Sequence, residues 1–222
     1  KIQVVLHTEQ GQMEYKYLKE PLEKYIERLS EKSPCPGGGS AAILSLALAN
    51  ALILMVCNYT VDSTKVEENS RKISKDILDN ALQIQPLINK YVEQDSIIYK
   101  EIQETMKVCR KDPTKATEYE NALKKSINLH IQILDYCQSM LRWNEILVEH
   151  CNPYLISDVG VSASLIEGVI RATEVNILIN LREIKNVQYV TEGTNKIQVL
   201  SSLIQKAIDI IRKVEMKISS GT

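Results

Sequence analysis

Apolar residues recur every three or four positions along most of the chain, with charged residues between them. This period is typical of helices that bury one face. It predicts helices over residues 21–33, 40–60, 64–110, 112–150, 157–184 and 195–216, with a looser stretch over 186–194. No alternation predicts a strand hairpin, and no internal repeat is visible. The sequence therefore predicts an all-α fold, a multi-helix bundle built from long helices.

Prolines set the breaks between the predicted helices. Ser33-Pro34 ends the first helix, and Asn152-Pro153 ends the fourth. Pro86 lies inside the third and predicts a kink or break there, because its ring removes a backbone hydrogen bond. Asp112-Pro113 has the residues preferred at an N-cap and at the first helical position, so it marks a fresh helix start.

Residues 41–59 carry no charged side chain. A stretch of this length is typical either of a helix buried on all sides or of a membrane span. Ser45, Asn50 and Asn58 interrupt it, alanines are frequent, and neither an aromatic belt nor a basic flank accompanies it. These features favour a central helix of a soluble bundle and predict no membrane partner.

Composition narrows the class of protein. The 222 residues are 44% hydrophobic, and we expect one helical domain over residues 13–222. Residues 1–12 are unusual in composition and are expected to be a leader, either vector-derived or disordered. A formal net charge of -1 predicts no nucleic-acid partner.

The spacing of the five cysteines indicates the redox state of the cellular compartment. They are widely spaced and include no C-x-x-C pair. This pattern predicts free thiols in a reducing cytoplasm rather than a disulfide framework or a zinc site. No basic-then-apolar secretory segment is visible at the beginning of the sequence.

The most specific local feature is the run Pro34-Cys35-Pro36-Gly37-Gly38-Gly39-Ser40, directly before the uncharged segment. Each glycine costs backbone entropy and gains no side-chain contact, so three in succession indicate that another group approaches the backbone closely. The first N–H groups of the following helix lack partners and favour negative charge. A tight turn between two helices is the alternative interpretation.

A second group of polar residues comprises Asn152, Ser157 and Asp158, followed by Asn176 and Asn180. Asn176 and Asn180 are four residues apart and share a face of an otherwise aliphatic helix. Their amides therefore either satisfy each other and nearby backbone or bind a polar ligand. Ser157 or Asp158 also suits an ordinary helix N-cap.

Other polar residues carry weaker signals. By position alone, Asp95 and Arg182 are ordinary charges on solvated helix faces. His130 and His150 are not spaced as a metal pair, and no second cluster of ligands supports zinc, so no metal site is predicted.

Taken in order, these segments resemble the formiminotetrahydrofolate cyclodeaminase and methenyltetrahydrofolate cyclohydrolase family. The glycine run resembles the family's opening motif. Asn152…Ser157-Asp158, followed by residues 176–184 (NILINLREI), resembles its second signature. Asp95 falls where the family carries an aspartate midway through its long helices. The resemblance extends from about Leu18 to Met216.

Three positions depart from the family pattern. Cys151 stands where glycine is frequent, Ile127-Asn128 replaces a usual Val-Pro, and Lys185-Asn186 replaces a segment that usually contains aspartate. These departures leave the expected fold unchanged. They keep open an alternative function, a non-catalytic folate-binding or scaffold dimer.

The resemblance implies an all-helical homodimer whose substrate is a tetrahydrofolate derivative carrying a one-carbon unit. A cyclodeaminase closes 5-formiminotetrahydrofolate to 5,10-methenyltetrahydrofolate and releases ammonia. A cyclohydrolase adds water across the methenyl bridge and gives 10-formyltetrahydrofolate. Either reaction needs proton transfer rather than a metal or a redox cofactor. The residues leave the choice between the two reactions open.

The resemblance also implies which residues share the site. Asp158 or Asp95 would transfer the proton. The glycine run would admit the flat ligand or its glutamate tail, the amides would bond the pterin, and an arginine would meet the tail. The implied substrate-binding residues are Pro36, Gly37, Gly38, Gly39, Ser40, Asn152, Ser157, Asn176, Asn180 and Arg182.

Overall fold

The structure, a computed structural model, describes residues 6–7, 13–14 and 16–220. Its long helices are α2 (Gly38–Val61), α3 (Glu68–Lys111), α4 (Ala116–His150), α5 (Ile156–Leu181) and α7 (Leu200–Ser220). The shorter helices are α1 (Leu22–Ser30) and α6 (Val187–Gln198). The remaining elements are the 3-10 turns η1 (Tyr17–Lys19), η2 (Pro113–Lys115) and η3 (Pro153–Leu155) and the strands β1 (Leu6–His7) and β2 (Met13–Glu14).

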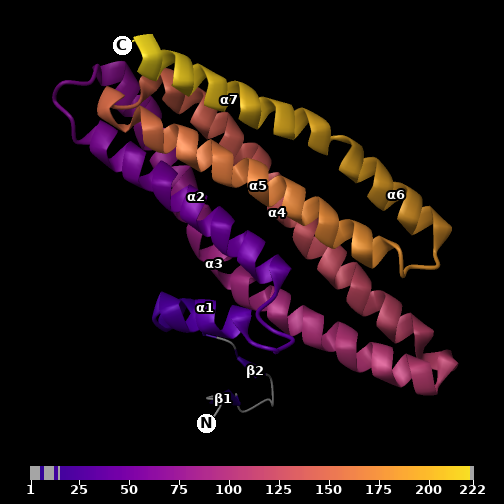
Figure 1. Cartoon of the computed structure of the whole chain (residues 1–222). Coiled ribbons are helices and arrows are strands. Elements are labelled where there is room, and N and C mark those ends of the chain that lie inside the picture. The colour runs from indigo at the N-terminus through magenta and orange to yellow at the C-terminus, as the bar shows by residue number, and fades with distance from the viewer. Residues whose placement is uncertain (1–5, 8–12, 15, 221–222) are drawn as a thin grey trace.

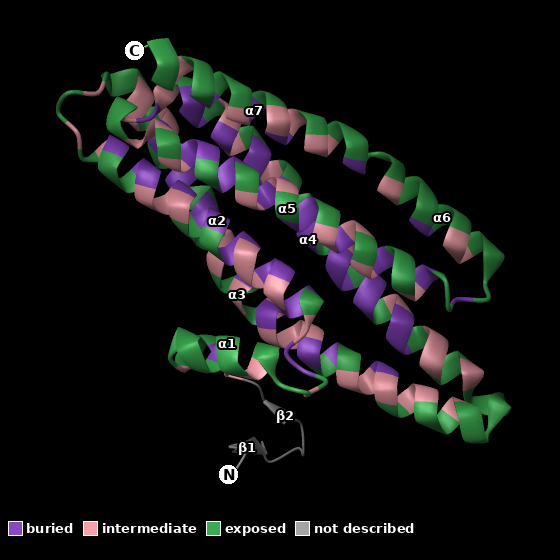
Figure 2. Cartoon of the chain, in the orientation of Figure 1, coloured by how far each residue is buried: buried purple, intermediate pink, exposed green. Residues whose placement is uncertain are grey.

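Four helices form the central ring. Around it, α2 packs against α3 and α5, and α4 packs against the same two helices from the opposite side. The last helix, α7, lies along α5 and α4, and α1 lies across the bundle close to the beginning of α2 (Figure 1). Buried positions follow the inner faces of these helices (Figure 2), and the core is aliphatic, with Ile43, Leu46, Ile133 and Ile170 fully buried. The predicted all-helical bundle is confirmed.

The uncharged helix α2 lies in this ring. By length and composition it could cross a membrane, with a mean hydropathy of 2.2 in its most apolar window, but 56% of that window is buried inside the bundle. Its buried Asn50 donates hydrogen bonds to the carbonyl of Ala81 (3.0 Å) and to Gln85 (2.8 Å). Both acceptors lie in the turn of α3 that precedes Pro86. The polar residue within α2 is therefore bonded to α3 just before its proline.

The segment predicted to kink or break at Pro86 is one helix, α3, so the predicted break does not occur. Proline removes one backbone N–H and disturbs the turn before it. Packing on α2, together with the Asn50 hydrogen bond to Ala81, supports that turn from outside. Tertiary contacts thus outweigh the local cost of the proline.

Two predicted boundaries were wrong. α2 begins at Gly38 rather than Ser40, so two glycines form its first turn. Residues 187–194, predicted as a looser stretch, belong to the helix α6. Gly193, which lies in that stretch, is buried in the helix, where an added Cβ would come within 2.8 Å of Leu181 Cδ2. Here glycine gives room for packing.

The polar residues at the helix starts have mixed roles. Asp112 accepts from the Thr114 N–H at 3.0 Å, as the predicted cap should. Asp158 lies in the first turn of α5, whose N-cap is Leu155, so the predicted cap is wrong. Asn152 instead caps η3, accepting from the Tyr154 N–H at 3.2 Å.

The described N-terminal residues include an antiparallel pair, in which Leu6 lies opposite Glu14 and His7 opposite Met13. Two-residue strands have no visible alternation, so the sequence pattern did not predict them. Apart from Leu6–His7, the leader expected over residues 1–12 lies outside the described residues.

Candidate active site

A cavity of about 220 Å³ opens where the N-terminus of α2 meets α3, α4 and the last turns of α5. It brings together three predicted features: the glycine run, the aspartate of the long helix and the pair of asparagines. Its lining residues are Pro34, Cys35, Gly37, Gly38, Gly39, Asp95, Tyr99, Ile102, Ser126, His130, Asn176, Ile179 and Asn180.

Asp95 of α3 forms the inner wall of this cavity. Its side chain is 13% exposed, and its Oδ1 lies 3.8 Å from Nε2 of His130. The backbone N–H of Ser40, in the first turn of α2, donates to the carboxylate. Burial raises the pKa of Asp95, while the His130 charge and the Ser40 hydrogen bond oppose that rise. A carboxyl group with a raised pKa is suited to exchanging protons near neutral pH.

The position of Asp95 explains Gly39. A Cβ added at Gly39 would lie 2.7 Å from Cγ and 2.8 Å from Oδ2 of Asp95, whereas one added at Gly38 would meet nothing within 4 Å. The group that approaches the backbone at Gly39 is therefore a carboxylate of the chain itself. The sequence predicted that the first N–H groups of α2 favour a negative charge. The carboxylate of Asp95 lies beside these groups and supplies that charge.

His130 of α4 is a site residue that the sequence analysis missed, since it was weighed only as a metal ligand. Its ring is 2% exposed, and Nδ1 lies 2.9 Å from the carbonyl oxygen of Ser126. A carbonyl can only accept, so Nδ1 carries a proton and Nε2 is the atom toward Asp95. Within the described part of the chain, the buried Nε2 has no hydrogen-bond partner. The sequence signal was one imidazole in the uncharged stretch 126–134.

The two asparagines of α5 differ in their surroundings. The Asn180 amide donates to Ser126 Oγ and to the carbonyl of Asn176, both at 3.0 Å. Both amide protons are thereby used, which leaves Oδ1 to accept from a ligand. The half-buried Asn176 side chain lines the cavity. The amides on this face were predicted either to bond within the protein or to bind a ligand. The NH2 group of Asn180 bonds within the protein, and its Oδ1 remains able to bind a ligand.

Ser40 and Pro36 lie behind the cavity wall. Ser40 is fully buried, its Oγ lies 3.1 Å from the Tyr25 hydroxyl, and it donates to the carbonyl of Val92 at 2.9 Å. Burial raises the pKa of Tyr25, which keeps its phenol protonated. Ser40 thus joins α1, α2 and α3 directly beside Asp95. Pro36 is buried in the loop and is absent from the cavity lining.

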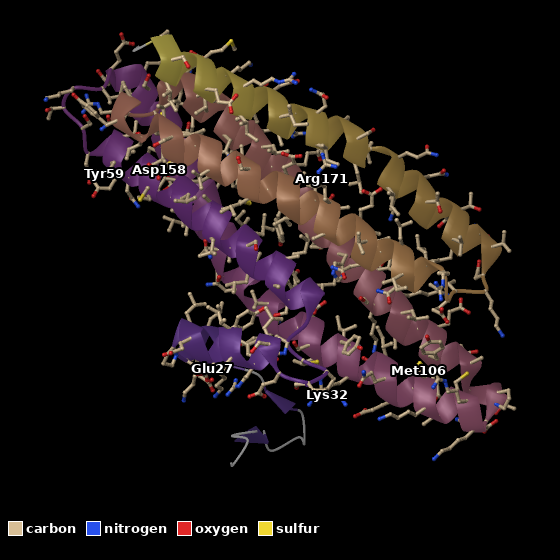
Figure 3. All side chains as sticks on the ribbon, in the orientation of Figure 1. Glu27, Lys32, Tyr59, Met106, Asp158 and Arg171 are labelled. Carbon is tan, nitrogen blue, oxygen red and sulfur yellow. The ribbon has the colours of Figure 1, made fainter. Side chains whose placement is uncertain are left out.

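The second signature begins at the other end of the bundle. The Asn152 N–H donates to Thr60 Oγ1 at 3.0 Å, near the C-terminus of α2. The length of α2 separates this point from Gly39 by about 30 Å. Figure 3 shows Asp158 beside Tyr59, far from Lys32, which precedes the glycine run. Within one chain the structure does not bring Asn152, Ser157 or Asp158 to the cavity.

Arg182 also lies outside the cavity lining. Its side chain is 76% exposed, and its Nε lies 3.6 Å from Glu183. It follows the last turn of α5, two residues after Asn180.

Among the described residues, the cavity contains no metal cluster and is separate from a second groove on the surface. No three His, Cys, Asp or Glu side chains gather into a metal site among the residues that the structure describes. A wider, open groove of about 530 Å³ follows α7. It contains surface charges such as Lys206, which pairs with Glu145 at 2.6 Å, and none of the predicted site residues.

Comparison with known families identifies the family to which the chain belongs. The sequence profile described as formiminotransferase-cyclodeaminase matches residues 21–199. The chain belongs to the formiminotransferase-cyclodeaminase family. The match includes the glycine run, Asp95, His130 and the two asparagines of the cavity. The resemblance seen in the sequence is thereby confirmed.

Relatives in this family have two kinds of name. A methenyltetrahydrofolate cyclohydrolase from Methylorubrum extorquens is 23% identical over 183 residues, covering 81% of this chain and 88% of that protein. A formimidoyltransferase-cyclodeaminase from Gallus gallus is 23% identical over 203 residues, covering 89% of this chain and 36% of that protein. The chain therefore spans about a third of the chicken protein.

A solved structure shares the fold of this family member. The formiminotetrahydrofolate cyclodeaminase of Thermotoga maritima superposes with a TM-score of 0.83 at 22% identity. The superposition covers 92% of this chain and all of that one.

Proposed function

We propose that the chain is a folate-dependent enzyme acting on the carbon that joins N5 and N10 of tetrahydrofolate, as a methenyltetrahydrofolate cyclohydrolase or a formiminotetrahydrofolate cyclodeaminase. Family membership and the names of the relatives support this class. One observation carries it: a desolvated carboxyl group, Asp95, in the wall of a cavity lined by amides.

Asp95 supplies the proton transfer that both reactions need. In hydrolysis, its carboxylate accepts a proton from the water that attacks the methenyl carbon. The resulting tetrahedral carbon is bonded to both nitrogens. The protonated carboxyl group then donates to N5 as the carbon–N5 bond breaks. The hydroxyl proton passes to the regenerated carboxylate, which releases it to water before the next turnover. In ring closure, N10 bonds to the formimino carbon while the carboxylate takes the N10 proton. The carboxyl group returns that proton to the amino nitrogen as the bond between this nitrogen and the carbon breaks and ammonia leaves.

The cavity suits the reacting rings rather than the whole folate. Its volume of about 220 Å³ is below the roughly 300–1,000 Å³ of pockets that enclose a drug-sized ligand. Asn176 and Oδ1 of Asn180 would bond the pterin, and Gly37 and Gly38 leave the mouth open. The glutamate tail would then lie outside, where Arg182 could meet its carboxylates.

Two assays on the purified chain test this function. Loss of 5,10-methenyltetrahydrofolate absorbance measures hydrolysis, and ammonia release from 5-formiminotetrahydrofolate measures ring closure. We expect at least one activity above buffer. Tight folate binding with neither activity would favour the non-catalytic alternative, and failure to bind any folate would contradict both functions.

We also propose that the chain acts as a homodimer in which a second copy covers α2 and α5. Their outer faces expose apolar side chains, including Leu48 (51%), Tyr59 (61%) and Val175 (65%). Between them an open groove of about 340 Å³, lined mainly by small residues, extends to Gly38 at the cavity. A two-fold axis through the middle of this face would set the Asp158 end of one chain against the cavity of the other. We expect a mass of twice 25.2 kDa by light scattering.

Mixing two inactive variants tests whether the site is shared. We expect Asp95→Asn and Asp158→Asn each to lose activity alone. After unfolding together and refolding, mixed dimers would contain one intact site, so about a quarter of wild-type activity would return. Full activity of Asp158→Asn alone, or no recovery on mixing, would contradict the shared site and leave Asp95 acting within one chain.

A further inference from the structure

The imidazole that faces Asp95 has no role in the mechanism so far. We propose that His130 is a positioning residue for Asp95: its Nε2–H, fixed by the Ser126 carbonyl, holds the carboxylate ionised and aimed into the cavity between proton transfers. This inference rests on the proposed function and deepens it. It concerns a residue of this chain that none of the sequence motifs contains.

The ring of His130 is held in one orientation. The hydrogen bond from Nδ1 to the Ser126 carbonyl (2.9 Å) joins residues one turn apart on α4. The orientation of the ring is therefore fixed relative to this helix. The ring is 2% exposed, which leaves no room to rotate toward solvent. Nε2 then lies 3.8 Å from Asp95 Oδ1, a separation longer than a hydrogen bond.

A positive charge at this distance acts on the proton that Asp95 exchanges. In its protonated form the imidazole stabilises the carboxylate before water or N10 gives up its proton, and again after the proton has passed to N5 or ammonia. No bond to His130 forms or breaks. Since the site is largely buried, this interaction is screened much less than it would be in water.

Other polar and titratable groups face Asp95 from each element packed against it. They are Tyr25 from α1, Cys35 and the Ser40 N–H at the start of α2, Tyr99 on α3, His130 on α4, and the uncharged Asn176 and Asn180 on α5. Among these described groups, His130 is the one whose side chain gains a positive charge on protonation. Replacing His130 alone therefore removes the one partner of Asp95 among these groups that can be cationic.

The pKa of Asp95 can be measured without any turnover. Carbon-13 NMR of labelled aspartate carboxyls, assigned through Asp95→Asn, would follow this group in His130→Gln. We expect its pKa to rise by about one unit or more, because an opposite charge within about 4 Å favours the ionised form. The control is His150→Gln, which alters a histidine bonded to Ser70 at the far end of α4 and should leave the Asp95 pKa unchanged.

Kinetics give a second readout. The acid limb of the kcat/KM profile should move upward by the same amount in His130→Gln. A shift of one unit means an approximately tenfold loss on the acid side and little loss at high pH, where Asp95 is ionised in both proteins. In an Asp95→Asn background, adding His130→Gln should cost nothing further.

The outcomes separate this inference from the proposed function. A wild-type chain without folate activity defeats the function, while the NMR titration still tests the pair. An unmoved Asp95 pKa in a His130→Gln protein with a wild-type melting temperature overturns the inference. If that variant does not fold, His130→Asn takes its place in the same titration. Additive kinetic losses in the double variant would likewise assign His130 a role independent of Asp95.

Discussion

Replacing Asp95 by asparagine is expected to lower kcat of the folate reaction by about 10²–10⁴-fold, the usual contribution of a general acid–base group. Asparagine keeps the shape of the side chain and can still accept the Ser40 N–H, but it cannot take up a proton. Turnover in the spectrophotometric assay measures the loss. The control is Asp76→Asn, an exposed aspartate of the same helix. A variant retaining half of wild-type kcat would remove Asp95 from the mechanism.

The same substitution should leave the protein at least as stable at neutral pH. Burial raises the pKa of Asp95 in the folded state. The folded chain therefore binds more protons than the unfolded chain between the two pKa values, and its stability falls as pH rises through that window. Asparagine avoids this loss. The gain in melting temperature should shrink below about pH 4, where aspartate is protonated in both states.

Gly39→Ala is the second substitution with a large expected effect. The added methyl group would lie 2.7 Å from Asp95 Cγ, so the carboxylate must move away from the Ser40 N–H. We expect a loss of roughly 1–3 kcal/mol in the free energy of unfolding, as for other overpacked sites. We also expect a fall of at least tenfold in kcat, because small displacements of catalytic groups have large kinetic costs.

Gly38→Ala is the matched control for stability. It makes the same chemical change one residue earlier, where the methyl group meets nothing within 4 Å. Its free energy of unfolding, from urea titration, should equal that of the wild type or exceed it, since alanine has less backbone entropy to lose. Equal stabilities for the two alanine variants would show that Asp95 does not require the glycine.

The sequence predicted those parts of the site that depend on local chemistry. The helical period located the elements, the glycine run marked a close backbone approach, and the asparagine spacing placed two amides on one face. Asp95 entered only through the family resemblance, because an aspartate on a long helix looks the same whether it is solvated or buried. Its burial depends on the first turn of α2, where Ser40 lies 55 residues earlier in the chain.

Two features of the site could not be predicted from local patterns. The contact between Asp95 and His130 depends on how α3 and α4 are aligned after a sharp connection at η2, and no spacing rule encodes that alignment. The separation of Asn152 and Asp158 from the cavity depends on topology. α2 was predicted at nearly its observed length, but the prediction did not say which end of α2 lies next to the second signature. The hydrogen bond from Asn152 to Thr60 shows that it is the C-terminal end.

Through Ser40, the packing of α1 against the bundle affects the pKa of Asp95. Its hydroxyl contacts Tyr25 of α1, and its backbone N–H contacts the carboxylate of Asp95. Peeling α1 from the bundle would admit water to that carboxylate and weaken the desolvation that raises its pKa. Truncations or antibodies that dislodge α1 should therefore return Asp95 toward the behaviour of a free aspartate, although none of the residues in α1 lines the cavity.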